Sequence, residues 1–221
     1  MSSHSIEQLR GKRVTIVALG DSNTDFNHWS FGRNWLSMLG CNASNFFGRH
    51  VIVNSGVSGD NVAGALARLE EDVLAFHPDL AIVSLGLNDA WQCTPREVFQ
   101  RDYRLILEKL LAIGACVLTR TSQPILDMRN GGEDVECAPG MEGYMADIVN
   151  ISKECDVPCV DHYSLWRESM KSPYKGELVM LMGNRLHPNE YGHRRLYAEL
   201  APFLHLESDF QNEYTHLLHH Q

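Results

Sequence analysis

Short apolar runs rich in β-branched residues recur five times along the chain, and several are followed directly by a polar turn. Runs of this length, closed by a breaker, predict buried β-strands. The expected strands are residues 14–19, 50–54, 80–85, 115–119 and 157–160. Between them, apolar residues recur at helical spacing with charged residues opposite, which predicts amphipathic helices. The expected helices are residues 29–39, 61–76, 95–111, 141–155, 163–170 and 189–204.

Strands that alternate with helices, without an internal repeat, predict an α/β fold in which a parallel sheet lies between helices. Right-handed crossovers place the carboxyl end of every strand at one edge of that sheet, where open parallel sheets bind ligands. Four polar turns fall on this edge or beside it: residues 20–24, 55–61, 86–89 and 183–188. The long loop 124–140 also follows a strand, and we interpret it either as a substrate or lid loop or as a surface insertion without a role.

Composition limits the classes of protein that fit this pattern. The 221 residues, 44% of them hydrophobic, suit one domain over residues 1–221 with a core from about residue 12 to 205. A net charge of −9 argues against a nucleic-acid partner. No apolar run approaches the roughly 18 residues of a membrane span. Residues 1–10 lack an apolar signal core, so the sequence as given predicts a cytoplasmic protein unless a signal peptide was trimmed. A homo-oligomer is compatible with this composition.

The cysteines and the terminal histidines give little indication of a metal site. Six scattered cysteines predict reduced thiols rather than disulfides. Cys155 and Cys159, with three residues between them, are only a weak indication of metal binding. The tail contains His216, His219 and His220, which we interpret as a loose or partner-docking end.

The polar turns contain the groups that acyl transfer needs: a nucleophile, a base within its reach, and donors for the developing oxyanion. Ser22 follows the first strand in Gly-Asp-Ser, as a nucleophile or, alternatively, as part of a helix cap. Gly59 has no Cβ, so its backbone N–H can approach a ligand closely. Asn88 supplies a second donor from the end of the third strand, and His187 supplies the base.

These residues resemble four blocks of the SGNH, or GDSL-type, hydrolase superfamily, in the family's order. The blocks are Gly20-Asp21-Ser22-Asn23-Thr24, Gly56-Val57-Ser58-Gly59-Asp60, Gly86-Leu87-Asn88-Asp89 and His187-Pro188. The resemblance implies a flavodoxin-like three-layer α/β/α sandwich and ester hydrolysis through a serine-bound acyl intermediate. It implies Ser22 as nucleophile, His187 as general base and then acid, and an oxyanion hole of Ser22, Gly59 and Asn88. It implies no metal and no organic cofactor.

The sequence departs from the family three residues before the histidine, where the usual aspartate is Asn184. An amide oxygen can accept the imidazole Nδ1–H and hold its tautomer, but it offers no full negative charge to the imidazolium. We favour a Ser22–His187 dyad oriented by Asn184 or by a backbone carbonyl. Alternatively, Asp161 substitutes for the missing carboxylate, or the site is impaired and the protein only binds its ligand.

The substrate is predicted from the residues around the expected pocket. Aromatic and hydrogen-bonding groups are mixed there and suit a sugar ring, which favours deacetylation of an acylated carbohydrate. The alternative functions are a short-chain esterase, thioesterase or lysophospholipase, and a carbohydrate-binding protein without catalysis. Alternatively, the tryptophans near the expected pocket serve only as core packing. The residues near the expected pocket are Asn23, Asp25, Asn27, His28, Trp29, Asn61, Trp91 and Gln92. We expect the pocket to include Asp21, Asn23, Asp60, Asp89 and Trp91.

Overall fold

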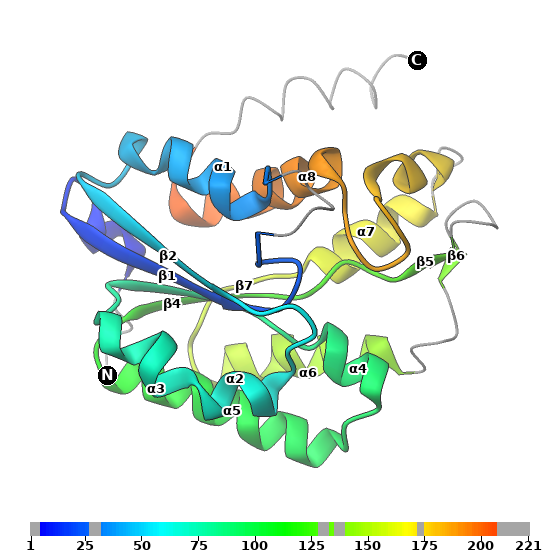
Figure 1. Ribbon diagram of the computed structural model, residues 1–221, viewed down its shortest axis with the longest axis horizontal. Coiled ribbons are helices and arrows are strands. Elements are labelled where there is room, and N and C mark those ends of the chain that lie inside the picture. Colours follow the sequence, from blue (N-terminus) through cyan, green and yellow to red (C-terminus); the bar gives the residue numbers. More distant parts are fainter. Residues whose placement is uncertain (1–4, 27–31, 128–132, 135–139, 172–174, 207–221) are drawn as a thin grey trace.

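The computed structural model describes residues 5–26, 32–127, 133–134, 140–171 and 175–206, and Figure 1 shows a central sheet between two layers of helices. Five parallel strands form this sheet in the order β2-β1-β3-β4-β7. The predicted α/β/α sandwich with a five-stranded parallel sheet is therefore confirmed, and every strand overlaps its predicted range. The strands are β1 (Val14–Gly20), β2 (His50–Gly56), β3 (Leu80–Ser84), β4 (Cys116–Arg120) and β7 (Cys159–Val160).

Helices cover both faces of the sheet (Figure 1). One layer contains α1 (Trp35–Asn42), α7 (His162–Met170) and α8 (Glu190–Leu200). The opposite layer contains α2 (Val62–Ala67), α3 (Leu69–Asp72), α4 (Leu87–Gln92), α5 (Arg96–Ala112) and α6 (Met141–Glu154). Short 3₁₀ helices complete the described elements: η1 (Ile6–Leu9), η3 (Ala43–Asn45), η4 (Leu74–Phe76), η5 (Lys175–Leu181) and η6 (Ala201–Leu204).

The side chains of β1 alternate between two hydrophobic cores. Val17 and Leu19 pack with residues of the α2–α6 layer, whereas Ile16 and Ala18 pack with residues of α1 and α8. All four are 0% exposed. Because both faces are covered, the strand is continuously apolar, which is the usual pattern of a buried parallel strand. The sheet therefore provides a rigid base for the turns at its carboxyl edge.

Two predicted helices and one predicted turn differ from the observed structure. The segment 61–76 is divided into α2, α3 and η4, because the backbone leaves the helical range at Arg68 (φ −101°, ψ 2°) and Val73 (φ −134°, ψ −60°). The predicted turn 86–89 contains the start of α4, a helix too short to give a periodic pattern. The helix predicted over residues 29–39 begins at Trp35, where Asn34 Oδ1 accepts the Ser37 N–H. Residues 29–31 of that prediction lie outside the described residues.

The loop 124–140 is described in part. Its strands β5 (Leu126–Asp127) and β6 (Glu133–Asp134) pair antiparallel, apart from the main sheet. Asn27, His28, Trp29, Cys137 and the tail histidines lie outside the described residues. Within the described part, Cys41, Cys93, Cys116, Cys155 and Cys159 are free thiols.

Candidate active site

The Ser22 turn folds back tightly over the end of β1. The Asp21 carbonyl accepts the N–H of Thr24 at 2.9 Å and of Asp25 at 3.0 Å, and Asp21 Oδ1 accepts the Asn23 N–H at 2.9 Å. A Cβ on Gly20 would lie 2.1 Å from Thr24 Oγ1, so only glycine permits this return of the chain. The Asp21 side chain therefore caps this turn, and Ser22 lies at the carboxyl edge of the sheet.

Neighbouring elements hold the far side of the same turn. Asn34 and Asn54 each donate an Nδ2–H to the Thr24 carbonyl, at 2.8 and 2.9 Å. The indole N–H of Trp35 donates to the Asn23 carbonyl at 3.0 Å. Because α1 and β2 both contribute donors, the turn is fixed between two elements of the fold.

Ser22 and His187 meet across 165 residues of sequence, with His187 Nε2 2.9 Å from Ser22 Oγ. The histidine lies in a loop that closes on itself, since its carbonyl accepts the N–H groups of Gly183 and Asn184 at 2.9 and 3.2 Å. Asn189 caps the following helix α8 by accepting the N–H groups of Tyr191 and Gly192. The imidazole is therefore presented by a short, internally bonded loop.

Asn184 contacts the other imidazole nitrogen. Its Oδ1 accepts the backbone N–H groups of Leu186 at 2.8 Å and His187 at 2.9 Å, which fixes the orientation of the amide. His187 Nδ1 lies 3.1 Å from Asn184 Oδ1 and 3.0 Å from Asn184 Nδ2. The amide can thus accept from a protonated Nδ1 through its oxygen, or donate to an unprotonated Nδ1 through its nitrogen, and so it is compatible with both tautomers.

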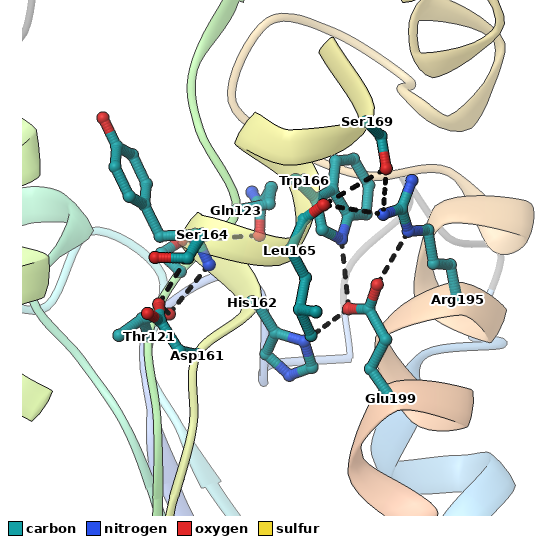
Figure 2. Close-up of polar contacts among 12 residues, drawn as sticks. Thr121, Gln123, Asp161, His162, Ser164, Leu165, Trp166, Ser169, Arg195 and Glu199 are labelled. Atoms are coloured by element: carbon teal, nitrogen blue, oxygen red, sulfur yellow. Dashed lines mark hydrogen bonds and ion pairs between the residues drawn. The ribbon is translucent and has the colours of Figure 1, made fainter. Parts of the chain in front are cut away.

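Asp161, the alternative carboxylate, accepts hydrogen bonds from residues other than His187. Its Oδ1 accepts the Thr121 hydroxyl at 3.0 Å and the Ser164 N–H at 3.2 Å, at the start of α7 (Figure 2). These contacts make Asp161 the N-cap of that helix. Asn184, rather than Asp161, is the residue that touches His187.

The predicted oxyanion donors lie on two loops and at the start of α4. Gly59 has φ +82°, in the left-handed region that glycine enters without strain. The adjacent Asp60 accepts Asn88 Nδ2–H on its carbonyl at 2.8 Å, so the second and third blocks are joined directly. The Val57 N–H donates to the Gly20 carbonyl at 3.0 Å, which joins the first and second blocks. All of the loops that carry the predicted donors are therefore connected.

The five residues expected to line the pocket differ in their exposure and in their contacts. Asp21 and Asn23 are 2% exposed and Asp89 is 0% exposed, so these side chains lie inside the protein. Asp60 forms an ion pair with Arg68. Trp91 is half-buried, and the guanidinium carbon of Arg185 lies 4.9 Å from the centre of its ring. Trp91 alone among the five presents partly exposed aromatic surface.

The pKa values of the buried carboxylates are shifted by their surroundings. Burial raises the pKa of Asp21 to about 6, against the opposing effects of the Asn23 N–H and the Arg120 guanidinium. Burial likewise raises the pKa of Asp89 to about 6, although its Oδ2 accepts the Val62 N–H at 3.0 Å. Arg120 is 1% exposed with its guanidinium 4.9 Å from the Trp35 ring, and burial lowers its pKa to about 10. Nothing in the sequence pattern of β4 indicated an arginine inside the core.

A second polar network holds α8, the helix that follows the histidine loop in the chain (Figure 2). The Glu199 carboxylate accepts from the Trp166 indole at 3.2 Å and from Arg195 Nε at 2.8 Å, and it lies 2.7 Å from His162 Nδ1. Arg195 in turn donates to Ser169 Oγ at 2.8 Å. Burial lowers the pKa of His162 to about 4, so this histidine is neutral at neutral pH and donates from Nδ1. The network joins α7 to α8.

The described residues were compared with the requirements of a metal site and of a membrane-spanning helix. Among them, no group of three or more His, Cys, Asp or Glu side chains is arranged to hold a metal ion. None of the described helices combines the length and apolarity needed to cross a bilayer.

Comparisons with known proteins identify the family. The model of the GDSL-like lipase/acylhydrolase family matches residues 18–195. An acetylxylan esterase of Geobacillus stearothermophilus is 30% identical over 154 residues, 64% of this chain and 66% of that protein. Esterase TesA of Pseudomonas aeruginosa is 29% identical over 104 residues, 47% of this chain and 52% of that protein. A solved catalytic mutant of an acetylxylan esterase from Geobacillus stearothermophilus has a TM-score of 0.73 at 21% identity, covering 88% of this chain and 95% of that one. This chain belongs to the GDSL-like lipase/acylhydrolase family of carboxylic ester hydrolases.

Proposed function

We propose that this protein hydrolyses acetyl esters of a carbohydrate through an acyl-serine intermediate. The 2.9 Å contact between Ser22 Oγ and His187 Nε2 supports this proposal most directly, because it pairs a hydroxyl with a base at the ligand-binding edge of the sheet. In this proposal one domain acts without a metal or organic cofactor. The cytoplasmic location and a homo-oligomer stay predictions from the sequence.

In the proposed reaction, His187 Nε2 takes the Ser22 proton as Oγ attacks the ester carbonyl carbon. The tetrahedral intermediate collapses when His187 returns that proton to the leaving alcohol. Water then attacks the acyl-serine with His187 again as base, and the acid is released as Ser22 regains its proton. The backbone N–H groups of Ser22 and Gly59 and the carboxamide of Asn88 stabilise the oxyanion in both steps, where such donors are most effective.

Asn184 has a defined part in this proposal. When Nε2 is free to accept the serine proton, Nδ1 carries a hydrogen, and Asn184 Oδ1 accepts it at 3.1 Å. That oxygen already accepts two backbone N–H groups, so it is shared among three donors. The amide nitrogen, which is nearest to Nδ1 at 3.0 Å, favours the unproductive tautomer.

We expect Asn184→Asp to raise kcat about tenfold, because a second carboxylate oxygen would take the place of Nδ2. A hydrogen bond to a charged group is worth about 1.4 kcal/mol more than a neutral one, which corresponds to that factor. Steady-state hydrolysis of an aryl acetate measures the change, with Asn150→Asp as the control, because Asn150 is exposed on α6. A large loss of kcat in a folded Asn184→Asp enzyme would contradict this role and make the amide itself a specific requirement.

The substrate class is proposed from Trp91 and from the relatives. A half-buried indole beside the Arg185 guanidinium offers an aromatic face and donors, which suit a sugar ring. The relatives matched above include proteins named acetylxylan esterase. A short-chain esterase, thioesterase or lysophospholipase is the second candidate, favoured by Phe26 and Val57, which are 57% and 44% exposed beside the first two blocks.

Two measurements test the proposed function. A fluorophosphonate probe is expected to label Ser22 in the parent enzyme, as detected by peptide mass spectrometry, and to leave the Ser22→Ala variant unlabelled. Release of acetate from acetylated xylo-oligosaccharides is then compared with hydrolysis of aryl esters of increasing chain length. Preference for longer acyl chains supports the second candidate. Carbohydrate binding without labelling or hydrolysis would instead identify a binding protein.

A further inference from the structure

Arg68 makes an unusual number of contacts with the loops at the carboxyl edge of the sheet. Its guanidinium donates to Ser55 Oγ at 2.7 Å, to the Ser55 carbonyl at 2.9 Å and to the Gly20 carbonyl at 3.3 Å. These acceptors stand at the ends of β2 and β1. One side chain therefore joins the points where two neighbouring strands enter the first and second blocks.

The same guanidinium holds the loop that contains Gly59. Arg68 Nε donates to Asp60 Oδ2 at 2.9 Å, and Nη2 lies 2.8 Å from the same oxygen. The side chains of Arg68 and Asp60 are 18% and 9% exposed, so the ion pair is largely shielded from water. Asp72, on the outer side, also accepts from Nη1 at 3.1 Å.

Asp60 connects Arg68 to both predicted oxyanion donors. It follows Gly59 directly, so fixing its carboxylate limits the movement of the Gly59 N–H. Its carbonyl accepts Asn88 Nδ2–H at 2.8 Å, which orients the Asn88 carboxamide. On the opposite side, a Cβ on Gly64 would lie 2.1 Å from Asp60 Oδ1, so α2 packs closely against the carboxylate.

We propose that Arg68 is a positioning residue that holds Gly59 and Asn88 in the geometry of an oxyanion hole. This inference rests on the proposed function. Arginine suits the task because its planar guanidinium carries five donors in fixed directions, and here it serves two strand ends and a carboxylate at once. Lysine offers one compact charge, so Arg68→Lys can keep the pair with Asp60 but cannot reach every acceptor.

The test compares Arg68→Ala with the parent enzyme in steady-state hydrolysis of an aryl acetate. Removing one oxyanion donor costs about 10²–10³ in kcat, and loosening two donors without removing them is expected to cost about 10- to 100-fold. The KM should stay near the parent value, because an oxyanion hole acts mainly in the transition state. Arg104→Ala is the matched control, since Arg104 pairs with Glu154 between α5 and α6, away from these loops.

Two further measurements separate positioning from simple stabilisation. Millimolar guanidinium, far below denaturing concentrations, should restore part of kcat in Arg68→Ala and have no effect on Arg104→Ala. Gly64→Ala should lower kcat in the same way by displacing the Asp60 carboxylate, although alanine has a higher helix propensity than glycine in α2. Gly64→Ala and Arg68→Lys also keep the inference testable if Arg68→Ala fails to fold.

The outcomes are distinct. A lower kcat at an unchanged KM, shared by Gly64→Ala and partly restored by guanidinium or by lysine, supports the positioning role. A parental kcat in the folded variants overturns it, as does a loss that guanidinium does not restore and Gly64→Ala does not reproduce. If the parent enzyme neither hydrolyses esters nor reacts with the fluorophosphonate, it is the proposed function that fails, independently of Arg68.

Discussion

Ser22→Ala is expected to lower kcat for an aryl acetate by about 10⁶-fold, and His187→Ala by a similar factor. Either change removes one half of the 2.9 Å pair between Ser22 Oγ and His187 Nε2, and neither partner can carry out acyl transfer alone. The Ser22→Ala/His187→Ala double variant is therefore expected to be no slower than the single variants, because the two residues act as a unit.

Single-turnover and steady-state rates of the three variants measure this non-additivity. Ser58→Ala is the matched control, since the Ser58 hydroxyl lies on the second block and donates to Asp25 Oδ2 at 2.8 Å, apart from His187. Multiplicative losses in the double variant would mean that Ser22 and His187 act independently. Full activity in Ser22→Ala would remove this serine from the mechanism.

Asp21→Asn is expected to stabilise the folded protein at neutral pH by about 3 kcal/mol. Asp21 is 2% exposed, and burial raises its pKa from 3.8 to about 6. The folded state therefore holds the proton more tightly than the unfolded state. This group's contribution to stability is most favourable below pH 4 and falls as the pH rises towards 6. An asparagine keeps an oxygen for the Asn23 N–H and carries no buried charge.

Urea unfolding of the parent and of Asp21→Asn at several pH values measures this difference. The variant should be more stable at pH 7.5 and equal to the parent below about pH 3, where Asp21 is neutral in both states. Asp156→Asn is the control, because Asp156 is exposed and its left-handed backbone suits asparagine as well as aspartate. A constant difference across the pH range would show that desolvation of the Asp21 charge is not its cause.

The inner strands β1, β3 and β4 were predictable because they are buried on both faces of the sheet. A strand such as β1, with 0–1% exposure at most of its apolar positions, requires a continuous apolar run, and such a run is visible in a single sequence. The candidate site could be predicted for a related reason, since parallel strands bring distant turns to one edge of the sheet. Ser22, Gly59, Asn88 and His187 could therefore be predicted from the polar turns and from the resemblance of those turns to the SGNH, or GDSL-type, blocks.

The supporting residues were not predictable in the same way. Arg68 and Arg120 act through contacts with segments far away in sequence, and neither belongs to a local pattern. The burial of three residues that were expected to line the pocket was not predictable either. Asp21, Asn23 and Asp89 flank the blocks, but the direction of each side chain depends on how the turn closes. Sequence position indicates the edge of a sheet; it does not indicate which side chains face the ligand.

The separation of 165 positions between Ser22 and His187 also bears on the synthesis of the protein. A ribosome produces the nucleophile long before the base, and a nascent chain generally folds from its N-terminus onwards. Under the proposed mechanism, an incomplete chain carries a serine that cannot yet attack an ester. Ester hydrolysis during cell-free translation would therefore begin only when α8 has docked, and its onset would report the completion of folding.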